Sequence, residues 1–470
     1  MPQTTQVEND VGQTRIISGN QWFGGVSDGV LSIVDQCLFT GTNFVSAVIV
    51  GRFAGTEQFA CYTLWFSLVM LAIAFQRSFF VSSYVVLCRR FRAQRQAQLR
   101  YSMLLALACM IAGILIIGET ISFSLGDPFP LVVPIAIAAG LLRDFIRRIA
   151  IADSNLVIAI VIDAVICVAQ LLGFLVLAFG LPDSFSAASS LGWAALVWGV
   201  VGSMAILLNR HPFQQNRFTL FYWRYLSRIG RWISYGQVLS TLQSYLLPWL
   251  LAAFHSLSLA GVYAACWTLV QIMSPIVEGV GNTIGPALAR HASQRAWHAF
   301  CDVVRTRTCF FALLAAGIAP LMFFGGRFAM LGLYGTEYAS HFNVLMLLTV
   351  AVVIRNLGIP CSKALTQLHL AHINVVITGI NLLTFVFAVP MLLFFMGSEG
   401  AAWGILLACI VSTPLRCGIA LHQMNQLVHG DRQCKSDRQT RISRQSNGDR
   451  SSNGQMRQCS PDLEPAGTSS

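Results

Sequence analysis

One arginine stands inside a long apolar run and is the first residue that suggests chemistry. Arg77 lies in LAIAFQRSFFVSSYVVL, about 11 residues before the nearest basic segment. At a rise of 1.5 Å per residue, a helix would place it about 16 Å below that segment. Its side chain could extend toward the surface, or its guanidinium could face the interior. There, its planar N–H groups would suit a phosphate.

A polar stripe precedes it in the chain. Asp35, Gln36, Thr40 and Asn43 follow one another at steps of one, four and three residues, which places them on one face of a helix. Two interpretations are open for this face. It could hydrogen-bond a neighbouring helix as part of the packing, or it could line a cavity that admits sugar hydroxyls.

The second half of the chain repeats part of this pattern. A shift of 201 positions places Gln36 on Gln237, Thr40 on Thr241 and Asn43 on Ser244, and it also places Arg77 on Glu278. Charge within an apolar helix is expensive and indicates function by default. Arg77 and Glu278 could pair in one conformation, or they could serve separately as phosphate site and proton carrier. We expect the residues that these shifts align to line a substrate cavity.

Further charges lie in two other apolar runs. Asp163 stands in one, and Arg143, Asp144, Arg147 and Arg148 end another. The latter group falls near the predicted cytoplasmic surface. It is equally suited to anchoring lipid headgroups and to binding substrate.

The composition requires a membrane around these residues. Hydrophobic residues make up 55% of the 470 positions and charged residues only 11%, against about 25% charged residues in soluble domains. We therefore predict an all-α polytopic membrane protein of about twelve transmembrane helices in two pseudo-symmetric six-helix lobes. The predicted spans lie near 27–51, 59–87, 101–122, 128–150, 155–181, 187–208, 232–254, 258–288, 308–325, 341–360, 371–396 and 400–421.

Arginine placement predicts the orientation. Segment 88–100 (CRRFRAQRQAQLR) holds five arginines and no acid, whereas the loops on the opposite side hold mostly Asp and Glu. Positive charge marks cytoplasmic loops, so both termini should be cytoplasmic. The expected order is a cytoplasmic N-terminal segment (1–26), an N-lobe of helices 1–6 (27–208), a basic cytoplasmic linker (209–231), a C-lobe of helices 7–12 (232–421) and a disordered cytoplasmic tail (422–470).

Three segments resemble one transporter family. VDQCLFTGTNFVSAVIVGRFAGTEQFACYTLWFSL, FHSLSLAGVYAACWTLVQIMSPIVEGVGNTIGPALA and MGSEGAAWGILLACI are similar to hairpins of polysaccharide (O-antigen-type) flippases in the multidrug/oligosaccharidyl-lipid/polysaccharide exporter superfamily. This resemblance implies two lobes that open a central cavity alternately to each side of the membrane. It also implies a lipid-linked, pyrophosphate-bearing oligosaccharide as the substrate.

Other classes find little support in the sequence. GVGNTIG has the wrong spacing for a dinucleotide fingerprint, and no P-loop, HExxH or GxSxG is present, so we expect no enzyme activity. The 13 cysteines form no CxxC pair, so we expect no metal site and no cofactor. The excess of basic residues is explained by topology, and no nucleic-acid partner is expected.

The sequence therefore predicts a flippase for lipid-linked oligosaccharide in a bacterial inner membrane. Its expected partners are membrane lipids, a polysaccharide polymerase and glycosyltransferases. A cation-coupled multidrug exporter of the same superfamily is the main alternative, and Asp35 would suit its coupling ion, H⁺ or Na⁺. A membrane glycan polymerase or ligase fits less well, because such an enzyme should carry a sizeable outer loop. The glycan, the coupling ion and the oligomeric state are left open.

Overall fold

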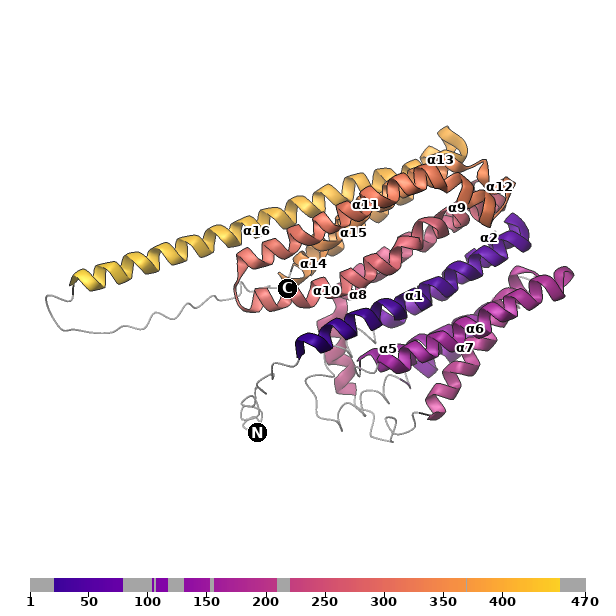
Figure 1. Cartoon of the computed structure of the whole chain (residues 1–470), viewed down its shortest axis with the longest axis horizontal. Helices are drawn as coiled ribbons and strands as arrows, with labels where there is room; N and C mark the ends of the chain where they lie inside the picture. Colours follow the sequence, from indigo (N-terminus) through magenta and orange to yellow (C-terminus); the bar gives the residue numbers. More distant parts are fainter. Residues whose placement is uncertain are drawn as a thin grey trace. The chain divides into compact units, whose positions relative to one another are not determined.

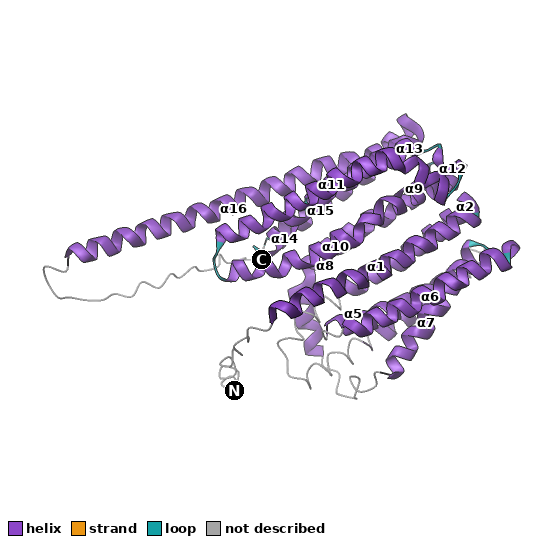
Figure 2. Cartoon of the chain, viewed as in Figure 1, coloured by secondary structure: helices purple, strands orange, loops and turns teal. Residues whose placement is uncertain are grey.

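The computed structural model describes residues 21–78, 104, 107–116, 131–152, 156–208, 220–368 and 370–448. Within these ranges the chain is helical, joined by short turns, and no strand occurs (Figure 2). Seven of the helical stretches are long and apolar enough to cross a membrane. The 55% hydrophobic composition and these apolar helices identify a polytopic membrane protein.

Five helices of the described residues make up the N-lobe (Figure 1). They are α1 (Gln21–Phe53), α2 (Gly55–Gln76), α5 (Val132–Ala152), α6 (Leu156–Gly180) and α7 (Ala187–Leu208). Helix α5 packs against α7, α2 and α6, and α1 packs against α6. The polar residues of α1 and α5 thereby come to lie inside this lobe. Of the expected third span, only Leu104 and residues 107–116 fall within the described residues.

The C-lobe follows the same order with more interruptions. Its helices are α8 (Leu220–Phe254), α9 (Leu257–Val270), α10 (Ser274–Ser293), α11 (Trp297–Leu333), α12 (Thr336–Ala339), α13 (Phe342–Leu357), α14 (Ile359–Gln367), α15 (Ala371–Met396) and α16 (Gly400–Gly448). The predicted eighth span is divided into α9 and α10 by the short 3-10 turn Gln271–Met273, and the tenth into α13 and α14. Pro360 at the start of α14 favours the second division, because proline suits a first helical turn but not a helix interior.

Two of the expected boundaries differ from the structure. The linker was expected to end at 231, but α8 already begins at Leu220. A disordered tail was expected from 422, but α16 continues to Gly448, and its Arg, Gln, Lys and Met residues are good helix formers. Residues 1–20 and 449–470 lie outside the described part of the chain. By its internal contacts the chain divides into two units, 1–420 and 421–470.

The two lobes make direct contacts where α1 turns into α2. The Tyr338 hydroxyl donates to the carbonyl of Gly51 (3.1 Å), and the Thr56 hydroxyl donates to Glu337 (3.2 Å). Helix α9 approaches α2 so closely that a Cβ on Gly261 would stand 2.2 Å from the carbonyl oxygen of Thr56. This end of the lobe interface, which we call the α1–α2 end, is closed by direct contacts.

Candidate functional site

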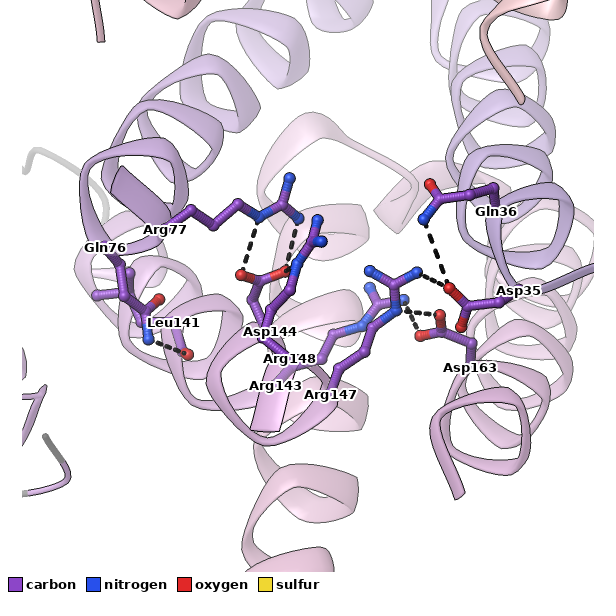
Figure 3. Close-up of polar contacts among 10 residues, drawn as sticks. All are labelled: Asp35, Gln36, Gln76, Arg77, Leu141, Arg143, Asp144, Arg147, Arg148 and Asp163. Atoms are coloured by element: carbon purple, nitrogen blue, oxygen red, sulfur yellow. Dashed lines mark hydrogen bonds and ion pairs between the residues drawn. The ribbon is translucent and has the colours of Figure 1, made fainter. Parts of the chain in front are cut away.

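Helix α5 carries two charged faces that its sequence spacing creates. Arg143 and Arg147 are four residues apart, as are Asp144 and Arg148, so the two pairs point in different directions from one helix. Figure 3 shows these side chains extending from α5 toward α2 on one side and toward α1 and α6 on the other.

The face toward α2 binds Arg77. The Nε and Nη2 groups of Arg77 donate to the two carboxylate oxygens of Asp144, at 2.9 and 2.5 Å. Arg148 lies beside the same carboxylate, with its Nε 3.8 Å from Oδ1. Arg77 itself lies in a π-helical turn that ends α2, a local distortion often found at functional sites.

The face toward α1 and α6 forms a second, deeper group. Arg147 donates from Nε to Asp163 of α6 (2.6 Å) and from Nη2 to Asp35 of α1. Arg143 donates to the other oxygen of Asp163 (3.1 Å). Gln36 lies beside this group, with its amide nitrogen 3.5 Å from Asp35. These charges come from α1 and from the consecutive helices α5 and α6, and their pairing joins the three helices.

Burial separates the two groups. The side chains of Arg143, Arg147 and Asp163 are 4%, 1% and 0% exposed, whereas those of Arg77 and Arg148 are 30% and 28% exposed. We call Arg143, Arg147, Asp35 and Asp163 the inner group, and Arg77, Asp144 and Arg148 the outer group. A buried ion is tolerated only with close partners, which the inner group has. The two arginine side chains of the outer group are only partly buried.

An aromatic ring of α1 lies among the guanidinium groups. The centroid of Phe39 is 4.7 Å from the Cζ of Arg147, 5.0 Å from that of Arg143 and 5.8 Å from that of Arg77. Each distance falls within the range of a cation–π interaction. The ring face therefore adds negative potential beside the guanidinium groups of both the inner and the outer group.

Glu278 of α10 lies near cations of both lobes. It is exposed, and it lies within electrostatic range of Arg77 and Arg148 from the N-lobe and of Arg355 and Lys363 from the C-lobe. Helix α10 packs against both α1 and α14, which places this acid between the lobes. Cations from both lobes therefore lie within electrostatic range of this carboxylate.

The predicted polar stripes have different surroundings in the two lobes. Asp35 and Gln36 are buried in the N-lobe, and Thr40 and Asn43 are half-buried. The matching residues of α8 meet no comparable charges: Gln237 is exposed, Thr241 and Ser244 are half-buried, and the Ser244 hydroxyl donates to the carbonyl of Ser240. The adjacent Gln243 instead accepts a hydrogen bond from Asn381 of α15 (2.9 Å).

Sequence reasoning did not identify the inner group as a unit. It placed Arg143, Asp144, Arg147 and Arg148 near the membrane surface. The first three are buried, which argues against their anchoring lipid headgroups, whereas Arg148 is 28% exposed. The useful signal was the four-residue spacing of like and unlike charges on an otherwise apolar helix. Nothing in the sequence singled out Arg355, Lys363 or Phe39 as site residues.

Comparison with known proteins gives a fold but no sequence relative. No family model matches the chain, and neither does any curated protein. Among solved structures, an inward-facing multidrug resistance MATE family transporter of the MOP superfamily matches with a TM-score of 0.70 at 11% identity. That match covers 84% of this chain and 96% of the other.

Two further neighbours come from named organisms. A mutant of the Vibrio cholerae MATE transporter VcmN matches with a TM-score of 0.65 at 14% identity, covering 85% of this chain and 96% of that one. A MOP superfamily transporter from Pyrococcus furiosus matches with a TM-score of 0.64 at 12% identity, covering 86% and 95%. The chain thus has the fold of MOP superfamily transporters, which confirms the predicted all-α polytopic class with about twelve spans in two lobes.

Proposed function

We propose that this chain is an alternating-access transporter that moves a lipid-linked, pyrophosphate-bearing oligosaccharide across a bacterial inner membrane for polysaccharide biosynthesis. The observation that carries the proposal is the set of accessible cations around Glu278. This acid lies within electrostatic range of two cations of one lobe, Arg77 and Arg148, and of two of the other, Arg355 and Lys363.

This charge arrangement suits an anion. Arg77 already forms a two-point contact with a carboxylate, and the same planar fork fits a phosphate group. The four cations outnumber the two carboxylates near them, Glu278 and Asp144, which leaves a surplus of positive charge. A pyrophosphate would relieve that surplus, whereas a cationic drug would increase it.

The uncharged polar residues suit the sugar portion. Gln237, Thr241, Thr40 and Asn43 offer hydroxyl and amide groups that are exposed or half-buried. Such groups can exchange hydrogen bonds with sugar hydroxyls without the desolvation penalty of a charge. A polysaccharide polymerase and glycosyltransferases would use and supply such a substrate, and they are the proposed partners.

The contacts at the α1–α2 end support alternating access. The Tyr338–Gly51 and Thr56–Glu337 hydrogen bonds lie at this end, and farther along α2 the Ser67 hydroxyl accepts a hydrogen bond from Trp249 of α8 (2.8 Å). These bonds join the two lobes and would have to break for the cavity to open at this end. We place this end outside and both termini in the cytoplasm, because the arginine-rich segments lie toward the other side.

A cation-coupled multidrug exporter is the second candidate. It is favoured by the likeness in fold to a multidrug resistance transporter. Against it, Asp35, the acid best suited to a coupling ion, is bound to Arg147. The Pyrococcus furiosus neighbour is described as having a binding pocket of reverse polarity that suggests a different function, so pocket charge varies within this fold.

Reconstitution distinguishes the two candidates. Purified protein in proteoliposomes should move a fluorescent lipid-linked oligosaccharide between leaflets, measured by the fraction that becomes accessible to a membrane-impermeant lectin. Arg355→Gln and Lys363→Gln should slow this movement without lowering membrane abundance. Efflux of cationic dyes with no movement of the glycolipid would instead support the drug exporter.

A further inference from the structure

Two carboxylates from different helices converge on one guanidinium in the middle of the N-lobe. Asp35 of α1 accepts from Nη2 of Arg147, and Asp163 of α6 accepts from Nε of the same side chain (Figure 3). Arg147 enters between them from α5. The three side chains are at most 2% exposed, so water contributes little to their solvation.

Without Arg147, this arrangement would be a site for a small cation. Two buried carboxylates close together cannot both remain charged unless a positive charge lies between them. Asp163 would retain Arg143, but Asp35 would lose its ion-pair partner among the described residues. Asp35 also has a carboxylate oxygen, Oδ1, that is buried and accepts no hydrogen bond even in the presence of Arg147.

We propose that Arg147 is a built-in cation that occupies the place where a free monovalent cation would otherwise bind between Asp35 and Asp163. The N-lobe then needs no coupling ion, because the positive charge that neutralises its acids is covalently part of α5. This inference rests on the proposed function and adds to it that transport is not coupled to a cation bound at Asp35. Its first test uses no substrate, so it does not depend on that function being correct.

The first test is a search for a created cation site. Arg147→Ala, purified in detergent at pH 8, should unfold at a higher temperature when guanidinium or Na⁺ is added at millimolar concentration than when choline is added. Selective binding to the folded state raises the midpoint of unfolding, and a rise on the order of a few degrees is expected. Wild-type protein should show no such difference among the three cations.

Arg148→Ala is the matched control. It removes the adjacent guanidinium of the same helix, but its carboxylate partner Asp144 keeps two hydrogen bonds from Arg77. No unpaired acid is created, so added guanidinium or Na⁺ should not stabilise this variant more than choline does. An equal gain in Arg147→Ala and Arg148→Ala would overturn the proposal, because it would show a general salt effect.

A second variant covers the case in which Arg147→Ala fails to fold. Asp35→Asn combined with Arg147→Gln removes one charge of each sign and leaves Asp163 paired with Arg143. We expect this double variant to accumulate at near wild-type levels, to show no cation-dependent stabilisation, and to transport at a rate within about twofold of wild type. Loss of transport at normal abundance would overturn the proposal, since it would give Asp35 a role beyond holding Arg147.

The last test measures whether transport by the wild-type protein depends on Na⁺ or K⁺. The rate in proteoliposomes should be unchanged when Na⁺ and K⁺ are replaced by choline on both sides. If wild-type protein instead requires Na⁺, and Asp35→Asn abolishes that requirement, a free cation acts at Asp35 and the proposal fails. If no glycolipid moves but the created cation site is found, only the proposed substrate is wrong.

Discussion

Arg77 and Asp144 form a two-point ion pair between α2 and α5, with donor–acceptor distances of 2.9 and 2.5 Å. Asp144 is 2% exposed, while Arg77 remains 30% exposed. The carboxylate is thus held within the N-lobe, and the arginine side chain that it orients is partly exposed. If Arg77 binds the substrate phosphate as proposed, Asp144 is the residue that positions its guanidinium.

This pair predicts different results for two substitutions of Arg77. Arg77→Lys keeps the charge but loses the fork, so transport should fall several-fold at nearly normal abundance. Arg77→Ala should also destabilise the protein by roughly 3 kcal/mol, the lower end of the range for removing one partner of a buried pair, because Arg77 is partly exposed. Membrane abundance, thermal unfolding and lectin-accessible glycolipid would be measured for each variant.

A double variant separates binding from stability. Arg77→Gln with Asp144→Asn leaves no unpaired carboxylate, so its stability should recover while transport stays low. If Arg77→Ala transported at the wild-type rate at equal abundance, Arg77 would have no role in the substrate site.

The sequence hypothesis linked Arg77 to Glu278 because the two coincide under the internal repeat. The structure instead gives Arg77 a bidentate partner in its own lobe, with Glu278 acting on it electrostatically. Repeat matching compares equivalent positions in two lobes, but it does not show which helices face each other within a lobe.

The spans and their polar faces could be predicted because hydropathy and helical period are local properties. The contact between Asp35 and Arg147 depends on the packing of α1 and α5, which are more than a hundred residues apart in sequence.

Glu278 should weaken the binding of an anionic substrate. Glu278→Gln removes one negative charge from among four cations while keeping the side-chain shape. A unit charge at roughly 8 Å in an effective dielectric of about 40 contributes about 1 kcal/mol, so the KM for the glycolipid should fall about fivefold. Glu57→Gln is the control, because Glu57 is an exposed acid at the start of α2. A higher KM for Glu278→Gln would indicate that this acid binds the substrate directly.

The α1–α2 end should open during transport. The hydroxyl oxygens of Thr56 and Ser258, from α2 and α9, are 3.4 Å apart, so cysteines at these positions are close enough to be tested for cross-linking. In a background without native cysteines, mild oxidation of Thr56→Cys/Ser258→Cys should stop transport, and a reductant should restore it. Each single-cysteine variant should be insensitive to the oxidant. Full activity of a quantitatively cross-linked protein would show that this contact does not break in the cycle.

Gly261 should be essential for closing the same end. Its Cα faces the carbonyl of Thr56 across the α2–α9 contact, and a methyl group there would stand 2.2 Å from the carbonyl oxygen. A backbone carbonyl within a helix cannot turn aside, so Gly261→Ala should separate α9 from α2 and destabilise the protein by about 1–3 kcal/mol. The loss of contact should also slow cross-linking between cysteines at 56 and 258.

Gly317→Ala in α11 is the matched control, because a Cβ at that helical glycine meets no atom within 4 Å. Its stability should be equal to or above that of wild type, since alanine favours a helix more than glycine does. Thermal unfolding and cross-linking rate would be compared for the two variants. If both tolerated alanine equally, the close approach of α2 and α9 would not be required for closure.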